Sequence, residues 1–375
     1  MNVDRCWIFY LCKPAFLCAP FLFEGDSSLS KLKSKGVQAI LWVVGLVLFG
    51  TVLYVAGIDA LEQIARSDFR YLAVTLAAVG SITAISSYRW GLVANTLAGQ
   101  ELASWGQYYH FNILARVTSL FVPRMAGDFG TRTLALTATK KTSVGLAFSS
   151  TILDRMFDIL DLAVLTLPCL LTITKVISLE MGGLMTLVFI LTISGLIATR
   201  WAALWRFLLS GMSSVATLGS RLPLVKRAIT PERVGRLREL ADHPIDSKLA
   251  LRIYLLTVAR TLLMVLRSHS VVLALGLSVP FLAIYLAVPA AQLFLLIAVT
   301  PMGLGLRELG WAGILALIGV SREDALTFSL GHRAYLYVTV AILGLLSYLN
   351  VALQRRRSGR SQLAPAPNPG DGTEQ

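Results

Sequence analysis

Long apolar stretches dominate the sequence and limit the folds that it can adopt. A helix needs about 20 largely apolar residues to cross a hydrocarbon core roughly 30 Å thick. Soluble domains carry roughly 25% charged residues, whereas this chain has 15%, together with 55% hydrophobic residues. The sequence therefore predicts an all-α, polytopic membrane protein and excludes a soluble enzyme. About eight transmembrane helices are expected: Val37–Gly57, Tyr71–Tyr88, Val144–Thr174, Gly182–Thr199, Ala250–Gly276, Phe281–Thr300, Leu304–Val320 and Phe328–Leu353.

One further hydrophobic segment, Trp105–Leu136, has charged residues at several positions along its length. We interpret it as a re-entrant pair of half-helices that enters and leaves through one face of the protein. Such breaks are tolerated where the backbone is buried in protein or lines a cavity. Proline and glycine interrupt two apolar regions in a similar way and are expected to form the re-entrant loops: Pro123, Gly127, Pro301, Gly303 and Gly305.

The net charge of +13 is distributed unevenly along the chain. Residues 1–36, 200–252 and 354–375 together carry +10 of it. Because Lys and Arg accumulate in cytoplasmic loops, both termini and the loop at about 200–250 are expected in the cytoplasm, with the protein in the cell (inner/plasma) membrane. The predicted parts are a cytoplasmic N-terminal extension (1–36), an integral membrane domain (37–353) and a disordered cytoplasmic tail (354–375). No nucleic-acid partner is expected, because stacking aromatics do not interleave with these basic residues.

Charged residues inside the predicted spans are the main functional signal. Each one costs a few kcal/mol at the centre of a bilayer unless it is paired or faces water. Asp154, Asp158 and Asp161 share one helix face, so cations must reach them from other helices. We assign these three to charge pairing or proton coupling. The candidate residues for binding a lipid headgroup are Arg89, Asn112, Arg124, Asp128, Arg132, Arg155, Arg260, Arg267, Glu308 and Arg333.

A structural alternative remains open for this set, in which the charges form salt bridges that only fix helix packing. No metal site or cofactor is expected, because the four cysteines show no CxxC or Cys/His ligand spacing. The nucleotide-binding pattern GxxxxGK[ST] is absent from the sequence as well. Energy for any transport would therefore come from a gradient or from a partner.

The order of these motifs resembles a known family. Asn112, Val122-Pro123, Gly127-Asp128, Arg132, Asp154-Arg155, Asp158 and the run from Pro301 to Glu308 follow the pattern of the transmembrane domain of lysylphosphatidylglycerol synthases. That domain also occurs alone in the UPF0104 group and in archaeal AglD-like proteins. The resemblance covers roughly residues 37–350. Asp154-Arg155 stands where the family usually has Glu-Arg, and Pro301-Met302-Gly303 stands where it usually has Pro-Gly-Gly.

The resemblance implies a lipid flippase-like protein with a membrane lipid as its substrate. In the full synthases a soluble domain follows the membrane part and transfers lysine to the lipid, whereas about twenty residues follow the last predicted span here. We therefore expect a transporter, not an enzyme. One alternative is a transferase that uses a lipid-linked sugar, with Asp59, Glu62 and Asp68 as its candidate carboxylates. Another is an accessory subunit whose partner is a lipid-modifying enzyme or a glycosyltransferase.

Overall fold

The protein is built from α-helices. The computed structural model describes residues 28–121, 124–139, 141–219, 245–297, 300 and 303–362. Within these ranges it contains no strand, which confirms the all-α prediction. The helices are α3 (Ser28–Ala65), α4 (Arg70–Ala98), α5 (Trp105–Thr118), α6 (Arg124–Thr137), α7 (Val144–Ile173), α8 (Leu179–Gly219), α10 (Ser247–Ala274), α11 (Phe281–Ile297), α12 (Leu306–Ile318) and α13 (Arg322–Gln362).

Six of these helices are long and apolar enough to cross a membrane, namely α3, α4, α7, α8, α10 and α13. The predicted count of about eight is not confirmed. The spans predicted over 281–300 and 304–320 correspond to α11 and α12, which have 17 and 13 residues. At a rise of 1.5 Å per residue they are about 26 and 20 Å long, which is less than the hydrocarbon thickness. The two helices are shorter than the predicted spans because the chain turns between them, around Gly303 and Gly305.

The distribution of side chains is the reverse of that in a soluble protein. Large aliphatic residues of the long helices are exposed, such as Val47 (62%) and Leu191 (63%). Arg89 and Asp154, by contrast, have no exposed surface at all. In water this arrangement would be unfavourable, because the aliphatic side chains on the outside would be exposed to water and the charged side chains on the inside would have lost their hydration. Surrounded by lipid, the exposed aliphatic side chains carry no such cost, so the arrangement fits a membrane-embedded bundle.

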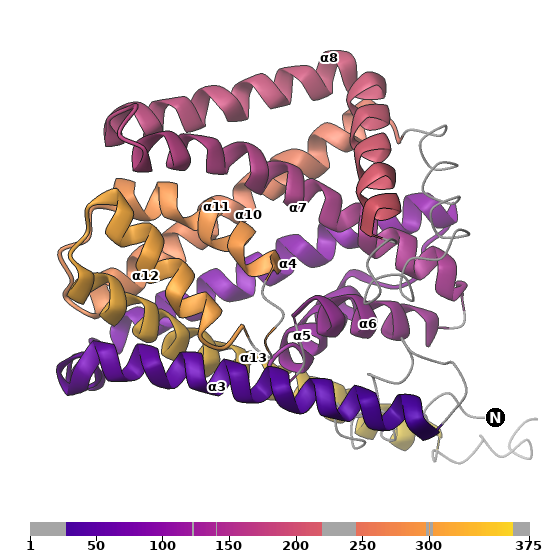
Figure 1. Ribbon diagram of the computed structural model, residues 1–375. Coiled ribbons are helices and arrows are strands. Elements are labelled where there is room, and N and C mark those ends of the chain that lie inside the picture. Colours follow the sequence, from indigo (N-terminus) through magenta and orange to yellow (C-terminus); the bar gives the residue numbers. More distant parts are fainter. Residues whose placement is uncertain are drawn as a thin grey trace, which may run out of the picture.

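Two pairs of short helices enter the bundle from opposite ends. The half-helix pair expected across Trp105–Leu136 is present as α5 and α6, with 14 residues each. The Ser104 side chain accepts a hydrogen bond from Gln107 N, and Gln107 Oε1 accepts one from Ser104 N, so α5 begins with a complete capping box. The pair α11–α12 is the counterpart, and the two pairs lie on opposite sides of the molecule in Figure 1. We call these sides the α5–α6 end and the α11–α12 end of the bundle.

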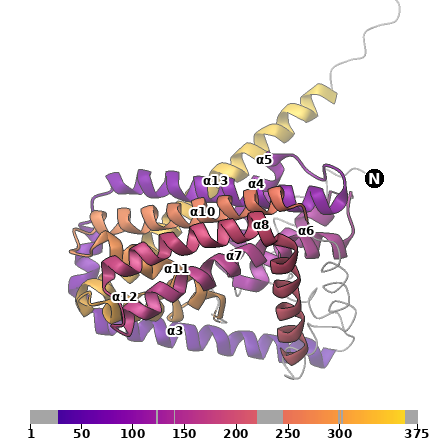
Figure 2. The same ribbon diagram turned by 90° about the horizontal axis from the view of Figure 1, so that it is seen from above.

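The chain divides into two halves with the same order of helices. In the first half two long helices, α3 and α4, precede the short pair α5–α6 and the long helix α7. In the second half α8 and α10 precede α11–α12 and α13. Each half holds three long helices, an odd number, so the second half runs in the opposite direction, as in transporters with inverted repeats. Figure 2 shows the long helices side by side, with the last part of α13 projecting beyond them.

Each short pair is anchored by its own cluster of buried side chains. Trp90, Tyr108 and Phe111 pack together where α5 meets α4, and the Trp90 and Tyr108 ring centroids are 4.9 Å apart. Trp311 and Phe328 pack where α12 meets α13, with centroids 5.2 Å apart. Aromatic pairs in this edge-to-face geometry stabilise beyond the area that they bury. The short helices are thereby held at fixed depths, although neither crosses the membrane alone.

Glycine permits a close helix approach at the break before α12. Gly305 has φ +75°, a conformation that residues with a Cβ adopt at a cost. A Cβ at this position would collide with Leu48 Cβ and lie 2.9 Å from the Leu48 carbonyl carbon. Gly127 is similarly tight, because a Cβ there would lie 2.9 Å from Ser119 Cα. Both breaks are therefore packed against neighbouring backbone.

We predict that Gly305→Ala lowers the stability of the protein by about 2–4 kcal/mol, because the new methyl group is strained and has no room. The measurement is the thermal unfolding midpoint of the purified protein in detergent micelles. Gly313→Ala is the matched control on α12, since no atom lies within 4 Å of a Cβ at that position. Equal midpoints for the two variants would contradict the prediction.

Candidate functional site

Two aspartates of α7 lie at the centre of the charged interior. Asp154 and Asp158 are one helical turn apart and only 0% and 4% exposed. Arg89 of α4 contacts both: its Nε lies 2.7 Å from Asp154 Oδ1 and its Nη1 lies 2.5 Å from Asp158 Oδ1. Buried charges at this depth require such pairing. One guanidinium therefore ties α4 to two successive turns of α7.

A second arginine reaches Asp154 from the half-helix α6. Arg132 Nη1 lies 2.8 Å from Asp154 Oδ2, so both oxygens of this carboxylate are engaged by arginines. Arg132 Nε is 3.0 Å from Asp128 Oδ1, one turn earlier on α6. Its Nη2 donates to Asn112 Oδ1 on α5. The α5–α6 pair is thus attached to the long helix α7 through the side chain of Arg132.

Two more arginines complete the cluster around Asp158. Arg155 Nη1 lies 2.5 Å from Asp158 Oδ2, and its Nη2 lies 2.5 Å from Asp128 Oδ2. Arg260 of α10 reaches Asp158 Oδ1 at 2.9 Å. We call these seven residues the arginine–aspartate network: Arg89, Asp128, Arg132, Asp154, Arg155, Asp158 and Arg260. With four arginines and three aspartates, it carries one net positive charge.

Sequence reasoning missed Thr257, which also belongs to this site. Thr257 Oγ1 accepts a hydrogen bond of 2.7 Å from Arg89 Nη1 and donates one of 2.8 Å to the Ile253 carbonyl. A threonine inside an apolar helix gives no signal alone. Its position three residues before Arg260 places both on one face of α10, and that spacing could have identified it.

A cavity of about 160 Å³ lies beside the network. Ser119 and Leu120 from the break after α5 line it, and so does Gly303 from the break before α12. Ile159, another lining residue, is 40% exposed, so the cavity opens to the surface of the bundle beside α7. Its described lining includes two aspartates, Asp128 and Asp158, and six arginines: Arg116, Arg132, Arg155, Arg260, Arg267 and Arg307. The two predicted breaks therefore meet at one strongly cationic cavity.

A second charged group lies at the start of α12. Glu308 is fully buried, and its Oε2 accepts a hydrogen bond of 2.8 Å from the backbone N of Gly305. Its Oε1 pairs with Arg333 of α13. Arg333 Nε donates to the Tyr337 hydroxyl at 2.5 Å. The Glu308–Arg333 pair thus fixes the N-terminal end of α12 against α13.

Buried His332 of α13 lies between two arginines that line the cavity. Arg267 Nη2 is 3.0 Å from His332 Nε2, and Arg307 Nη2 is 3.3 Å from His332 Nδ1. His332 itself is only 1% exposed. The predicted headgroup residue Arg267 therefore faces a histidine here, in the same cavity as the network.

The remaining candidates are placed as follows. Asp161 shares the α7 face with Asp154, but its Oδ2 accepts a hydrogen bond of 2.6 Å from Thr261, and the described residues hold no ion pair to it. Its Oδ1 is buried without a hydrogen-bond partner. Arg124 begins α6, and its side chain lies outside the described residues, as do Pro123 and Pro301.

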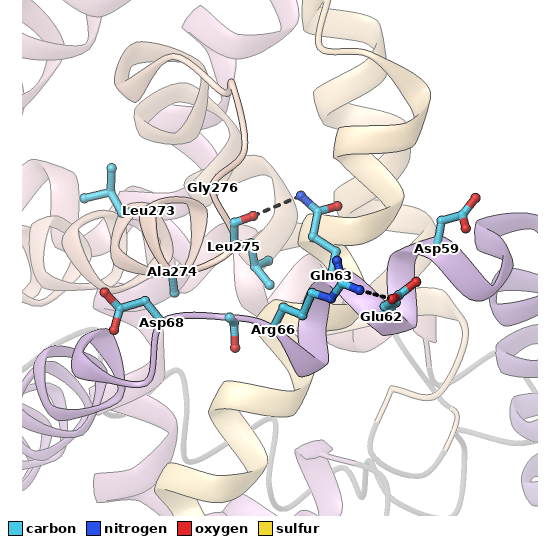
Figure 3. A pocket seen from close by; sticks show the side chains of 10 residues that line it. Asp59, Glu62, Gln63, Arg66, Asp68, Leu273, Ala274, Leu275 and Gly276 are labelled. Carbon is cyan, nitrogen blue, oxygen red and sulfur yellow. Dashed lines mark hydrogen bonds and ion pairs between the residues drawn. The ribbon is translucent and has the colours of Figure 1, made fainter.

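The carboxylates considered for a transferase lie in a different part of the protein. Asp59, Glu62 and Asp68 line a separate cavity of about 430 Å³ at the α11–α12 end, beside Leu273–Gly276 (Figure 3). Glu62 pairs with Arg66, and Asp68 Oδ1 accepts a hydrogen bond of 2.9 Å from the backbone N of Arg70. Among the described residues, no group of three or more His, Cys, Asp or Glu is placed to hold a metal ion.

We predict that Asp154→Asn destabilises the protein by about 3–5 kcal/mol, because it leaves two buried arginines without their shared carboxylate. The matched control is Asp161→Asn, on the same helix face and equally buried, where the carboxylate has a threonine partner. The unfolding midpoint and the yield of folded protein in detergent are the measurements. A loss of stability as large for Asp161→Asn as for Asp154→Asn would contradict the assigned role of Asp154.

Comparison with known proteins identifies the family to which this chain belongs. Residues 40–344 match the model of the lysylphosphatidylglycerol synthase TM region. A UPF0104 membrane protein of Methanothermobacter thermautotrophicus is 22% identical over 321 residues, which are 81% of this chain and 90% of that protein. No solved structure matches the chain. Since the match covers most of the chain and confirms the resemblance seen in the motifs, the protein belongs to the family with the lysylphosphatidylglycerol synthase transmembrane region.

Proposed function

We propose that this protein moves a lipid with an anionic headgroup between the two leaflets of the membrane. The observation that carries the proposal is the cavity in which six arginines accompany two aspartates. In a medium of low dielectric constant, an excess of positive charge strongly favours a negatively charged ligand. Intramembrane ionisable residues that face a cavity are the usual mark of a substrate pathway.

The remaining walls of the cavity suit a lipid better than a soluble anion. Leu162, Met264 and Leu295 contribute apolar surface beside the arginines. Ile159 of the long helix α7 is partly exposed at the cavity wall, and we infer that a headgroup enters laterally there. The acyl chains then stay in the bilayer, where they carry no desolvation cost. The amphipathic lining therefore supports a substrate with a charged head and apolar tails.

The two broken helix pairs suggest how the headgroup travels. The α5–α6 pair lies at one end of the bundle and the α11–α12 pair at the other (Figure 1), and residues from the break in each pair line the cavity. Transporters with inverted repeats expose a central site alternately by moving one element against another. In this protein we infer that each pair opens one leaflet to the cavity in turn. Arg132 and Glu308 then carry the contacts that must change.

The transferase alternative receives less support. It requires carboxylates of the α11–α12 end, and Glu62 and Asp68 there accept hydrogen bonds from arginine residues. None of the lining of that cavity is shared with the arginine-rich cavity. An enzyme that joins a sugar to a bound headgroup would need the two functions together. The accessory-subunit hypothesis depends on a docking surface in the loop at about 200–250, of which residues 220–244 lie outside the described residues.

We also propose that both termini lie in the cytoplasm, so that the α11–α12 end faces away from it. The basic segments flanking the membrane domain support this orientation. In a chain with its four cysteines replaced by serine, a membrane-impermeant thiol reagent added to intact cells should label Asp59→Cys and spare Lys248→Cys. Labelling of Lys248→Cys alone would reverse the orientation.

We predict that the purified protein in proteoliposomes accelerates leaflet exchange of a fluorescent phosphatidylglycerol, measured by dithionite quenching of the outer leaflet. Arg307→Gln should slow the exchange roughly tenfold or more, because it removes a cavity charge worth at least about 1.4 kcal/mol of binding. Arg70→Gln is the control, since this side chain is 94% exposed. It should retain the wild-type rate.

A fluorescent phosphatidylcholine tests the dependence on charge in the same vesicles. Its exchange should be slower than that of phosphatidylglycerol, because the phosphatidylcholine headgroup carries no net charge to match the arginines. Wild-type rates equal to those of protein-free vesicles for both lipids would overturn the proposed function.

A further inference from the structure

Asp161 differs from the two other aspartates that share its face of α7. It has no exposed surface, like Asp154. Asp154 and Asp158 are both paired with arginines, whereas the described residues hold no ion pair within 4.0 Å to Asp161. An isolated charge is strongly unfavourable at this depth. Asp161 is therefore a buried titratable group that charge pairing does not explain.

The hydrogen bonds of Asp161 suit a neutral carboxyl group. Its Oδ2 accepts a hydrogen bond of 2.6 Å from Thr261 Oγ1, and its Oδ1 is buried without a hydrogen-bond partner. An ionised carboxylate offers about four acceptor sites, so a single hydroxyl group replaces little of its hydration. A proton on Oδ1 would remove the charge and with it most of the cost of burial. Burial therefore favours the protonated form of Asp161.

The nearest cations act in the opposite direction. Arg89 of α4 and Arg260 of α10 both interact electrostatically with Asp161. Both belong to the arginine–aspartate network, which carries one net positive charge. The terminal nitrogens of Arg260 contact Asp158, and its Nε is buried without a hydrogen-bond partner. Nearby positive charge favours an ionised carboxylate. Burial and the network therefore oppose each other at Asp161.

The other groups around Asp161 do not pair with it. Asp158 lies one turn before it on α7, and the hydroxyl groups of Tyr254 on α10 and Tyr285 on α11 interact with it electrostatically. The charged residues of α8 are exposed. The buried or half-buried charged residues and histidines that remain on the helices packed against α7 are Asp128, Arg132, Arg267, His269, Arg307 and Glu308. The protonation of Asp161 therefore responds to the net charge of its surroundings, not to one contacting ion.

An anion that enters the cavity changes this balance. The anion lowers the total charge of the site by one and so cancels the positive excess that favours an ionised Asp161. A proton on Asp161 restores the total charge that the site had before the anion entered. In a medium of low dielectric constant, this compensation is strongly favourable. Anion binding and protonation of Asp161 therefore strengthen each other.

Asp161 lies directly behind the cavity wall. Asp158 and Leu162, which flank it on α7, line the cavity, and so does Arg260, which precedes Thr261 on α10. Asp161 is not among the lining residues and has no exposed surface. A proton can pass between these side chains, whereas a headgroup cannot. A substitution at Asp161 thus changes the charge behind the binding surface and leaves the surface itself intact.

We propose that Asp161 binds one proton when an anionic headgroup occupies the cavity, and that the protein moves the anion and the proton together. The proton comes from solvent and forms an O–H bond at Oδ1, and no bond of the lipid breaks. A proton gradient then drives the lipid in the direction in which protons flow. The inference rests on the proposed function in taking a lipid as the anion, while the coupling between anion and proton does not depend on it.

Asp161→Asn tests the proposal, because asparagine has nearly the size of the carboxyl group and stays neutral at every pH. The probes are dioctanoyl phosphatidylglycerol and glycerophosphoglycerol, which is the same phosphodiester without acyl chains. Each is titrated calorimetrically into purified protein in detergent from about pH 5 to pH 8. Two buffers with different enthalpies of ionisation are used, so that the difference in heat counts the protons taken up. Asp59→Asn is the matched control, since Asp59 is exposed and does not line the arginine-rich cavity.

We expect the wild type to take up close to one proton for each phosphatidylglycerol that it binds. Because the ligand prefers the protonated form, the affinity should fall as the pH rises, by up to about tenfold per pH unit for one linked proton. Asp161→Asn should bind the lipid without proton uptake and with an affinity that does not change with pH. Asp59→Asn should behave as the wild type does. If Asp161→Asn does not fold, Asp161→Leu replaces it with the same expectation, since leucine is neutral and of similar volume.

The outcomes that contradict the proposal are distinct from those that contradict transport. Wild-type binding without proton uptake at every pH would overturn the coupling, and undiminished uptake by the Asp161 variants would overturn its assignment to Asp161. Proton uptake with glycerophosphoglycerol but not with the lipid would keep the proton site and overturn the lipid as its anion. Leaflet exchange of phosphatidylglycerol without proton uptake would leave the proposed transport standing and overturn this inference alone.

Discussion

The bond from Arg89 to the two aspartates of α7 is the interaction on which the rest of the structure depends. A lone guanidinium or carboxylate at this depth would be strongly destabilising, so these residues can be buried only together. Asp154 and Asp158 bring four arginines to one place, and these come from α4, α6, α7 and α10. The network therefore fixes where α7 lies among its neighbours. Apolar packing alone would fix this position only weakly, because lipid tails are as apolar as the helix surfaces and compete for the same contacts.

The broken helices follow from the same constraint. A continuous helix across Trp105–Leu136 would place its charges at several depths, some of them facing lipid. The turn after α5 allows Asn112 and Arg132 to reach the same carboxylate-rich centre from two short helices. The turn before α12 likewise allows the Gly305 backbone to approach Leu48 and Glu308 to meet Arg333. Backbone irregularity is tolerated there because it is buried in protein or lines the cavity.

Much of this could be predicted from the sequence, and the failures have physical reasons. The spacing of Asp154, Asp158 and Asp161 indicated one helix face that needs cations from elsewhere, and Arg89 and Arg260 provide them for the first two. Asp161 differs because Thr261 faces it, and spacing on one helix does not show which residue lies opposite. The spans predicted over 281–300 and 304–320 are short helices, because hydropathy measures how apolar a segment is and not where it turns back. The spacing of Thr257 to Arg260 could have identified it as a member of the same helix face, but its hydrogen bond with Arg89 is apparent only when α4 and α10 are placed side by side.

The two halves of the chain repeat one buried pair of positions, since Arg89 and Asp154 are 65 positions apart and so are Arg267 and His332. If both halves held a carboxylate between their arginines, each would be internally neutralised, and the cavity would attract an anion less strongly. If neither did, the buried positive charge would oppose folding. With Asp154 in one half and His332 in the other, the first half places a carboxylate between two of its arginines, Arg89 and Arg132, where the second half places an imidazole between Arg267 and Arg307. The helices that contact His332 are α10, α12 and α13, so a change at this position would act on the α11–α12 pair directly and on the α5–α6 pair only through the network.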